Sequence, residues 1–457
     1  MLFEESFSVE NLQAIFLENI KNKSGKGIDG ISCEKFDRDL AQLVGKISSK
    51  AESCSYRFSP YLEIVKSKGR GKQPRIISKP TVRDKLALSA LKNILHENYP
   101  DCVQNQLPNK YIRDIKSVVS KHDIEELYYL KIDIKGFYDN LNHKILLDKC
   151  LSELDDKRVL SLVRRAIINK TVPKNYKRSN SKQYQNTVGV PQGLSISNVL
   201  AGIYMRKFDQ MFENIGIKYF RYVDDILILA KETELDEIEN KVESALIEIG
   251  LETNDKTEKG KFTKPFDYLG YEISSSHISV RESTIDRYIT SIIAKITDFK
   301  SNYNHRVNNS KWLSADQIKE LFILNLNEKI TGAITEKKRY GWIFYFIEIS
   351  NVHLLHKIDA IIRSQFSRLS MFENKPPKEL KSLARSYYVA KYSPFNGYIH
   401  NYSSYDTTAK KIQFLVKFGY ISENDSKEYT VEEIERRFEA AKMSHLVKLE
   451  EDIGNIS

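Results

Sequence analysis

The stretch Lys218–Ala230, KYFRYVDDILILA, constrains the fold more than any other part of this 457-residue chain. Two runs rich in aromatic and aliphatic residues flank the adjacent acids Asp224 and Asp225. This pattern predicts a β-hairpin with both acids at or beside its turn. Asp is common wherever a backbone reverses direction. The pair by itself therefore fits ordinary turn chemistry as well as it fits a functional site.

A third acid, Asp133, lies between Ile132 and Ile134 near the end of an apolar strand in the stretch Tyr128–Asn140, YYLKIDIKGFYDN. A carboxylate in such a strand needs a cation or a metal ion, unless the strand end is open to solvent. Carboxylates from neighbouring strands predict a pair of Mg²⁺ ions about 3.5–4 Å apart. Hard cations take oxygen ligands, which explains aspartates here. We expect Mg²⁺ as the cofactor, with Mn²⁺ as a substitute, and in-line displacement at a phosphate as the chemistry.

The first part of the chain alternates between helical and strand-like segments, which predicts a mixed α+β region. Helical spacing of apolar residues occurs over Val9–Lys21, Thr81–Asn98, His143–Leu154, Asp155–Asn169 and Ser195–Asn214. Short strand-like runs cover Tyr61–Lys66, Arg75–Ser78, Tyr128–Ile134, Lys218–Tyr222, Ile226–Ala230, Phe266–Tyr271 and His277–Val280.

Beyond about Glu282 the strand signals stop, and an almost entirely helical region is expected. The helical patterns cover Ser283–Asn302, Ala315–Lys329, His353–Arg368, Thr408–Lys417 and Thr430–Glu450. The polar tract Lys300–Lys311 and the tract Asn374–Pro377, NKPP, are candidate junctions because both disfavour a continuing helix.

The charge, 71 Lys and Arg against 61 Asp and Glu, suits a polyanionic partner without proving one. The four cysteines form no Cys-x-x-Cys pair, which argues against a zinc ribbon and a disulfide framework and fits a reducing cytoplasm. The start of the chain does not have the pattern of a signal peptide. The most apolar tract, Gly341–Ile349, is too short to cross a bilayer, so we expect it in the core and expect no membrane partner.

The order of the motifs resembles the bacterial reverse transcriptases, the broad group that contains group II intron, retron and defence-associated enzymes. The likeness covers about residues 27–273. It consists of KGIDGIS (Lys26–Ser32), RIISKPTVRDKLAL (Arg75–Leu88), KIDIKGFYDNLNH (Lys131–His143), GVPQGLSISNVLAGIY (Gly189–Tyr204), FRYVDDILIL (Phe220–Leu229), GLETNDKTEK (Gly250–Lys259) and FDYLGYEI (Phe266–Ile273). Seven blocks in the family's order make coincidence improbable.

The resemblance implies a right-hand polymerase: fingers and palm with an antiparallel sheet over residues 1–281, a helical thumb over 282–372, and an all-α C-terminal region over 373–457 with a possible RNA-binding or assembly role. Asp133, Asp224 and Asp225 match the family's catalytic metal ligands, and the resemblance implies the Ile134 carbonyl as a further oxygen ligand. Tyr138 matches the position whose ring blocks a ribose 2′-hydroxyl. It is therefore expected to select deoxynucleotides.

Several other residues match substrate-binding positions of the family. Gln192, in a Pro-Gln-Gly turn, resembles the contact to the incoming nucleotide. Arg75 resembles the fingers residue that grips the triphosphate, with Lys66 or Lys68 as the second cation. The insert between these lysines and Arg75 leaves the choice open. Lys256 occupies the family's position near the active site, and a surface lysine in a polar turn is the plain alternative.

Within this group the chain looks most like a stand-alone, defence-associated reverse transcriptase, because neither an endonuclease-like Cys/His segment nor an RNase H carboxylate set is recognisable. The tract Thr331–Phe346 resembles the thumb-to-tail region of such enzymes. This tract and the tyrosine-rich tract Arg385–Lys411 combine aromatic and basic residues. They could bind RNA by stacking and phosphate contacts, but packing in the core is the stronger expectation.

The resemblance implies an RNA-directed DNA polymerase that copies a dedicated non-coding RNA template into cDNA from dNTPs, in antiviral (phage) defence. Template-independent or repetitive DNA synthesis by the same site is one alternative. An RNA-binding scaffold derived from a polymerase is another, and the intact acids together with Tyr138 and Gln192 argue against it. An oligomer or an accessory protein is left open.

Overall fold

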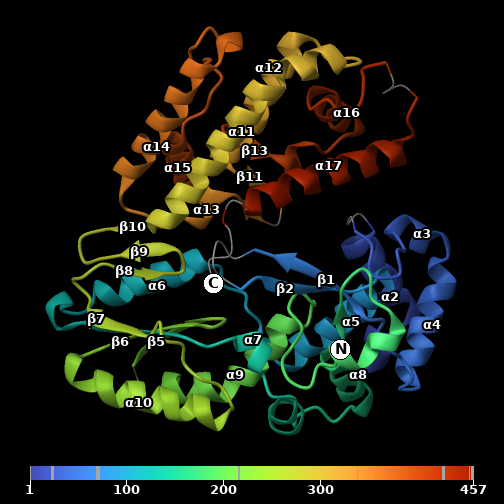
Figure 1. The fold of residues 1–457 in the computed structure, drawn as a ribbon, viewed down its shortest axis with the longest axis vertical. Coiled ribbons are helices and arrows are strands. Elements are labelled where there is room, and N and C mark those ends of the chain that lie inside the picture. Colours follow the sequence, from blue (N-terminus) through green and yellow to red (C-terminus); the bar gives the residue numbers. More distant parts are fainter. Residues whose placement is uncertain are drawn as a thin grey trace. The chain divides into compact units, whose positions relative to one another are not determined.

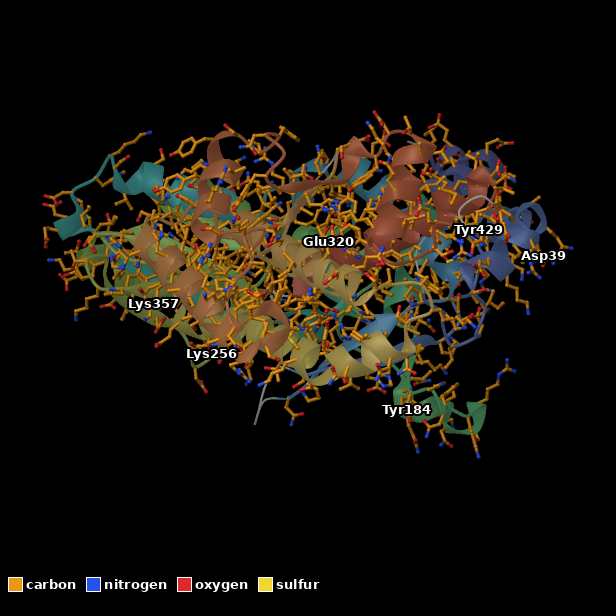
Figure 2. All side chains as sticks on the ribbon, turned by 90° about the horizontal axis from the view of Figure 1, so that it is seen from above. Asp39, Tyr184, Lys256, Glu320, Lys357 and Tyr429 are labelled. Carbon is orange, nitrogen blue, oxygen red and sulfur yellow. The ribbon has the colours of Figure 1, made fainter. Side chains whose placement is uncertain are left out.

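The computed structural model describes residues 2–21, 25–67, 73–214, 217–336, 338–424, 428–451 and 453 (Figure 1). The chain divides into two compact units. The first comprises residues 1–106 and 125–261, and the second comprises residues 107–124 and 262–456. Each unit contains its own buried apolar cluster. Charged side chains such as Asp39, Glu320 and Lys357 are exposed at the surfaces of the units (Figure 2). The finer division at residues 281 and 372 stays a prediction.

The first unit contains a four-stranded antiparallel sheet in the order β5-β6-β3-β7. Its strands are β5 (Lys218–Tyr222), β6 (Asp225–Ala230), β3 (Tyr128–Asp133) and β7 (Glu258–Lys261). Strand β6 is central, and Ile226–Leu229 are fully buried, which explains why this run is apolar rather than alternating. Helices α9 (Ser197–Asn214) and α10 (Glu232–Glu248) pack against the sheet (Figure 1).

A smaller sheet of the first unit joins β1 (Tyr61–Lys66) to β2 (Arg75–Lys79) antiparallel and to β4 (Thr171–Val172) parallel. Beside it, helix α5 (Val82–Asn98) is capped by Thr81, whose hydroxyl accepts from the Asp84 N–H at 3.2 Å. Its many buried side chains form the centre of the core. Further helical segments are α1 (Phe3–Ser6), α2 (Val9–Ile15), η1 (Phe16–Ile20), α3 (Cys33–Arg38), α4 (Leu40–Glu52), η2 (Pro100–Cys102), η3 (Ile124–Glu126), α7 (Phe137–Asn140), η4 (Ile145–Cys150), α8 (Lys157–Ile167) and η5 (Arg178–Tyr184).

The second unit is mainly helical. Its helices are α6 (Pro108–Val119), α11 (Glu282–Asn309), α12 (Ala315–Thr331), α13 (Trp342–Tyr345), α14 (Val352–Ser364), η6 (Gln365–Arg368), η7 (Ser370–Phe372), α15 (Leu383–Tyr392), η8 (Tyr402–Ser404), α16 (Thr408–Lys417) and α17 (Val431–Glu451). An antiparallel sheet is made by β8 (Phe266–Tyr268), β9 (Tyr271–Ile273) and β10 (Ile278–Val280). No helix in the described parts of the chain is long and apolar enough to cross a membrane.

The predicted α+β polymerase fold with an antiparallel sheet and a helical C-terminal region is confirmed, but some details were wrong. The helical region contains a small sheet of two-residue strands, β11 (Ala333–Ile334), β12 (Arg339–Tyr340) and β13 (His400–Asn401). The single strand expected over Phe266–Tyr271 is broken into the hairpin β8–β9, because Leu269 and Gly270 both have positive φ, 50° and 78°. The polar tract that begins at Lys300 continues α11 to Asn309.

The aromatic tract Thr331–Phe346 belongs to the core. Trp342 is buried and stacks on Tyr288 with ring centroids 4.6 Å apart, and Phe344 and Phe346 are buried as well. Glu348, the acid of the apolar tract, accepts from Arg113 of α6 at 2.7 Å and from Lys116 at 3.2 Å. Of the two interpretations of this tract, packing in the core is therefore the one that fits its aromatic side chains.

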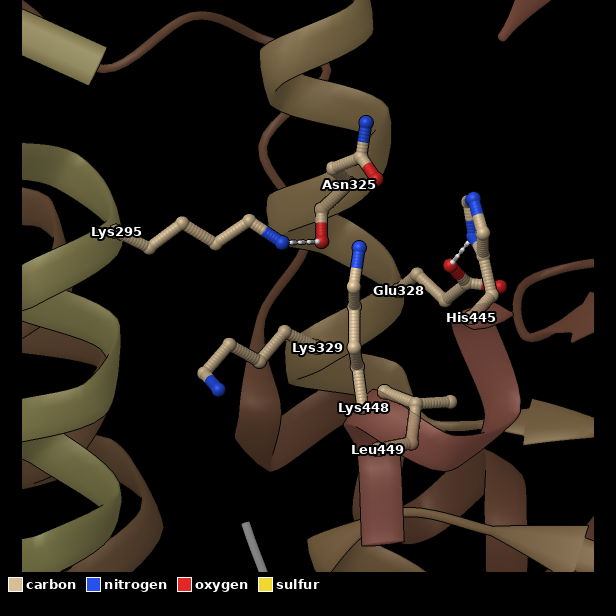
Figure 3. A pocket seen from close by; sticks show the side chains of 7 residues that line it. All are labelled: Lys295, Asn325, Glu328, Lys329, His445, Lys448 and Leu449. Atoms are coloured by element: carbon tan, nitrogen blue, oxygen red, sulfur yellow. Dashed lines mark hydrogen bonds and ion pairs between the residues drawn. The ribbon is translucent and has the colours of Figure 1, made fainter. Parts of the chain in front are cut away.

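A buried acid, Glu328 of α12, connects three parts of the second unit. It accepts hydrogen bonds from His445 Nδ1 of α17 at 2.5 Å and from the Tyr402 hydroxyl at 2.6 Å, and His400 Nδ1 lies 3.9 Å from it. Figure 3 shows Glu328 and His445 beside a small pocket that Lys295, Lys329 and Lys448 also line. Such a network is costly to break because each partner is shielded from water.

We expect the second unit to lose stability as the pH falls. Burial alone would raise the pKa of Glu328, but the hydrogen bond and charge of His445 outweigh it, so the pKa is lowered. A lowered carboxyl pKa contributes stability above the unfolded-state value, and this contribution is lost as the pH falls through the folded-state value. Burial also lowers the pKa of His400, with Lys381 and Lys417 adding to the effect and Glu328 opposing it. Below about pH 6.5 the unfolded chain therefore binds a proton at His400 that the folded chain does not bind, and this lowers the stability of the fold.

Chemical denaturation between about pH 7.5 and about pH 4 would measure this loss. The matched variant is His400→Gln, which keeps a polar side chain but cannot titrate. Its stability should fall less than that of the native chain between about pH 6.5 and about pH 5. Parallel pH profiles of the two proteins would contradict the role given to His400.

Candidate active site

The four-stranded sheet brings the predicted carboxylates to one of its ends. Asp133 is the last residue of β3 and Asp225 the first residue of β6, and the two are direct partners in the antiparallel register. Side chains of directly opposed residues lie on the same face of a sheet. Asp224 is one residue away in the β5–β6 turn, and its carbonyl accepts from the Ile134 N–H at 3.4 Å. The chain therefore gathers three acids at one strand end.

The turn that carries Asp224 is strained. Tyr222 pairs with Asp225, so Val223 and Asp224 form a two-residue loop. Such hairpin loops need positive φ at their first central residue, where Gly or Asn is usual. Val223 occupies this position with φ 59°, an uncommon conformation for a β-branched residue. The surrounding structure must therefore hold the turn in place.

Arg221 is the side chain that holds this turn. Its Nη1 donates to the Val223 carbonyl at 2.8 Å, and its Nε donates to Asp209 of α9 at 2.6 Å. The Tyr219 hydroxyl donates to the same Asp209 oxygen at 2.7 Å. The Arg221 and Asp209 side chains are only 11% and 22% exposed. The acidic turn is thus tied through a shielded ion pair to the helix beneath the sheet.

The Asp133 side of the site is built by the loop before β7. Asn254 donates to Asp133 twice, from its backbone N–H to the carbonyl at 2.8 Å and from Nδ2 to the carboxylate at 2.9 Å. Lys256 Nζ lies 3.7 Å from the same carboxylate, and its side chain is 71% exposed. Lys256 thus lies near Asp133 on an exposed side chain (Figure 2), and its role at the site stays a prediction.

Tyr138 lies beside this acidic end, on α7. Its hydroxyl donates to Asn198 Oδ1 of α9 at 2.9 Å, and its ring contacts Phe137 edge to face. Burial raises the pKa of Tyr138 well above its usual range, the charge of Asp224 raises it further, and Arg221 and Arg75 oppose the change. The phenol is therefore neutral at physiological pH.

The loop containing Gln192 is fastened to Tyr138, to the next residue Asp139 and to strand β2. The Val190 N–H donates to the Tyr138 carbonyl at 2.7 Å, Gln192 Nε2 donates to Asp139 at 3.2 Å, and the Gln192 carbonyl accepts from the Ser78 N–H of β2 at 2.7 Å. A Cβ on Gly189 would lie 2.7 Å from the Asp139 carbonyl oxygen. This approach explains the glycine, which also has φ 87°.

Strands β1 and β2 place the predicted cations. Lys66 ends β1, Arg75 begins β2, and the two are partners in the register. Lys66 is exposed, whereas Arg75 is partly buried. Lys68, the alternative to Lys66, lies outside the described residues. All the other predicted site residues belong to the first unit, and Lys66 and Arg75 lie on the smaller sheet rather than on the sheet that carries the acids.

The donors suit a hard divalent cation, since Asp133, Asp224 and Asp225 offer carboxylate oxygens and Ile134 a backbone carbonyl. Within the described ranges, however, no three His, Cys, Asp or Glu side chains form a preformed metal cluster. One Asp133 oxygen already accepts from Asn254. The metal roles of these four residues therefore stay predictions.

Sequence reasoning missed the residues that position the site. Asn254, Asn198, Arg221 and Asp209 hold Asp133, Tyr138 and the turn. Asn198, Arg221 and Asn254 occur inside three of the quoted motif blocks, and that was the available signal. Asp209 shows no such signal, because it looks like one more polar residue on a helix.

Comparison with known proteins agrees with this arrangement. Residues 65–273 match the family described as reverse transcriptase (RNA-dependent DNA polymerase). An uncharacterized 91 kDa protein in the cob intron of Schizosaccharomyces pombe is 24% identical over 223 residues, 48% of this chain and 27% of that protein. The group II intron-encoded protein LtrA of Lactococcus lactis subsp. cremoris is 24% identical over 208 residues, 45% of this chain and 34% of that protein. The chain thus spans about a third or less of the length of these relatives.

Solved structures with partial likeness include a telomerase from Candida albicans in complex with a fragment of telomeric RNA, at 15% identity and a TM-score of 0.44 over 88% of this chain and 69% of that chain. An apo telomerase from Candida tropicalis has 16% identity and a TM-score of 0.39 over 53% of this chain and 60% of that chain. The family match and the architecture of the first unit carry the assignment. The chain contains, over residues 65–273, a reverse transcriptase domain whose relatives include group II intron-encoded proteins.

Proposed function

We propose that this protein is an RNA-directed DNA polymerase that adds deoxynucleotides to a primer 3′ end with two Mg²⁺ ions, which Mn²⁺ could replace. The register that opposes Asp133 to Asp225, with Asp224 in the adjoining turn, carries the proposal. Asp133, Asp224, Asp225 and the Ile134 carbonyl would hold the metal ions. Bound Mg²⁺ lowers the pKa of a primer hydroxyl and offsets charge on a triphosphate.

The chain's other groups would place the substrate. Arg75 and Lys66, paired across β1 and β2, can bind the triphosphate of a dNTP, because guanidinium and ammonium groups are strong donors to phosphate oxygens. Gln192, fixed between Asp139 and Ser78, can contact the incoming nucleotide. Lys256 adds a positive charge next to Asp133. Each of these roles places a donor where negative charge accumulates in the reaction.

The proposed activity is tested by supplying the purified chain with Mg²⁺, dNTPs and RNA templates of differing sequence, each annealed to a DNA primer. The expected product is complementary to the template supplied and changes when the template changes. A product whose sequence ignores the template would instead support template-independent or repetitive synthesis. Absence of incorporation with every template and with added Mn²⁺ would support the scaffold alternative.

Tyr138 is expected to select the sugar. In Tyr138→Ala the discrimination against rNTPs, measured as the ratio of kcat/KM values, should fall by about 10²-fold, since the ring no longer fills the space beside C2′. Tyr138→Phe is the control, because it keeps the ring and loses only the bond to Asn198. Equal discrimination in the native and Ala proteins would contradict this role.

We also propose that the template is a dedicated non-coding RNA, that the cDNA serves antiviral defence, and that the protein acts in the cytoplasm. The resemblance of Thr331–Phe346 to stand-alone defence enzymes supports the second point, and four cysteines without a disulfide fit the third. Sequencing of RNA that co-purifies with the native protein should return one dominant species. Phage plating on cells that carry Asp225→Asn should lose any protection that the native gene confers.

A further inference from the structure

Helix α15 and the loop after it display an aromatic and basic surface in the second unit. Tyr388, Tyr392 and Phe395 are 49%, 70% and 68% exposed, and Arg385 and Lys391 are exposed beside them. We call these five residues the α15 face. Neighbouring exposed rings such as Tyr388 and Tyr392 are unusual on a protein surface and mark an interaction site.

The α15 face has a definite structural origin. Leu383, Ala384, Tyr387, Val389 and Ala390 are buried and anchor one side of α15, and the Tyr387 hydroxyl donates to the Ile349 carbonyl at 2.7 Å. Positions 385, 388 and 392 follow helical spacing and lie on the opposite side. The anchored side fixes the helix, so Tyr388 and Tyr392 are presented by a regular element, while Phe395 lies in the loop that follows it.

The rings of the α15 face are preordered. Tyr388 and Tyr392 are nearly parallel, with an interplanar angle of 18° and ring centroids 6.5 Å apart. Lys391 Nζ donates to the Tyr387 hydroxyl at 2.8 Å and lies 5.9 Å from the centre of the Tyr392 ring. Arg385 lies 4.5 Å from the centre of the Tyr398 ring. Lys391 is thus fixed next to the exposed Tyr392 ring, and Arg385 is fixed against Tyr398 of the following loop.

The segment that carries the α15 face is basic in sequence. Residues 380–405 contain Lys381, Arg385 and Lys391 and no Asp or Glu. The exposed residues of 383–397 include no Leu, Ile, Val or Met, which are the side chains that commonly line protein-docking grooves. Aromatic rings with neighbouring cations are instead typical of surfaces on which unpaired bases stack while phosphates are neutralised.

We propose that the α15 face binds single-stranded RNA, with bases stacked on Tyr388, Tyr392 and Phe395 and phosphates next to Arg385 and Lys391. The phenolic hydroxyls and the exposed Ser393 and Asn396 supply polar groups for ribose 2′-hydroxyls, which distinguish RNA from DNA. This surface is separate in sequence from the reverse transcriptase domain. The inference does not depend on polymerase activity.

The test measures the fluorescence anisotropy of labelled oligo(U), about 20 nucleotides long, with the full-length chain and an excess of unlabelled RNA–DNA template–primer to occupy the polymerase site. Replacing Tyr388 and Tyr392 together by Ala should raise the Kd on the order of 10- to 100-fold. Ala favours helix, so α15 is expected to persist. Replacing both by Phe keeps the rings and should largely keep the affinity. Trp312→Ala removes another exposed aromatic residue of this unit and should leave the Kd unchanged.

Further measurements distinguish RNA binding at this surface from DNA binding, from binding at the polymerase site and from self-association. Oligo(dT) of the same length should bind more weakly than oligo(U), and Arg385→Gln should reduce the slope of log K against log salt by about 0.7. The Arg385 measurement also serves if the double Ala variant fails to fold. Asp225→Asn should bind oligo(U) as the native chain does, so a failure of the proposed catalytic site is distinguished from a failure of this surface. An unchanged Kd in the double Ala variant, or changed self-association in light scattering without a change in RNA binding, would overturn the proposal.

Discussion

Asp225→Asn is expected to reduce dNTP incorporation on the order of 10³-fold or more, with little effect on folding. The substitution keeps the shape of the side chain and removes one negative charge directly opposite Asp133. A polymerase site that depends on hard-cation binding loses its function with that charge. Removing one of several neighbouring like charges does not weaken the fold, so the free energy of unfolding should change by less than about 1 kcal/mol.

A second measurement follows the metal without catalysis. A ligand that binds only the folded state raises the melting temperature. Added Mg²⁺ or Mn²⁺ should therefore stabilise the native chain more than the Asp225→Asn variant. This comparison would show whether the acids can bind metal although the described chain has no preformed three-residue cluster.

Asp236→Asn is the matched control. Asp236 lies in the same unit on α10, its side chain is 84% exposed, and it pairs with Lys259 at 2.6 Å. Exposed ion pairs contribute little to stability, and Asp236 is not one of the predicted site residues. The Asp236→Asn control should therefore keep native activity and the native response to Mg²⁺. Activity in Asp225→Asn above about a tenth of the native value would contradict the assignment, because a metal ligand cannot be lost at so small a cost.

Patterns of side chains predicted the parts of the fold that follow from burial alone. The apolar run of β6 predicted the hairpin that carries Asp224 and Asp225. The apolar strand before Asp133 predicted the neighbouring strand, and the structure pairs the two. Helix α10 was missed although Leu235, Ile238, Val242 and Leu246 are buried at helical spacing. The many acidic residues of α10 made this helical spacing of apolar residues hard to recognise.

Backbone conformation was the part that side-chain patterns could not predict. Neither Val223 nor Leu269 looks like a residue with positive φ, yet both occupy tight hairpin turns because tertiary contacts override their preference. The polar end of α11 is a second case. Asp298 accepts from Asn302 and from Arg306, both at 2.6 Å, and these bonds continue the helix where composition suggested a junction.

Arg221→Met should both destabilise the first unit and slow nucleotide incorporation. The substitution leaves Asp209 with the Tyr219 hydroxyl and without its cation, and removes the donor to the Val223 carbonyl. Breaking a buried pair costs about 3–5 kcal/mol, and partial exposure of Asp209 reduces this to about 2–3 kcal/mol. A loosened turn no longer holds Asp224, so kcat should fall at least about 10-fold. Denaturant unfolding and single-nucleotide incorporation measure the two effects.

Arg206→Met separates loss of stability from loss of the turn. Arg206 lies on the same helix as Asp209 and pairs with Asp101 at 2.6 Å and with Glu153 at 2.9 Å, so its removal also breaks ion pairs of α9. None of those partners belongs to the β5–β6 turn. This variant should lose some stability and keep its kcat. A matching loss of kcat would show that any weakening of α9 slows the reaction and that Arg221 has no particular role.

Val223→Gly then tests whether the strained turn is the link between Arg221 and the acids. Gly adopts positive φ without the steric penalty of a β-branched residue, so the turn depends less on Arg221 once Val223 is replaced. In the Val223→Gly background, Arg221→Met should therefore lower kcat by a smaller factor than in the native background. Equal factors in both backgrounds would mean that Arg221 acts on Asp224 by some route other than the Val223 carbonyl, because two substitutions on one path cannot have independent effects.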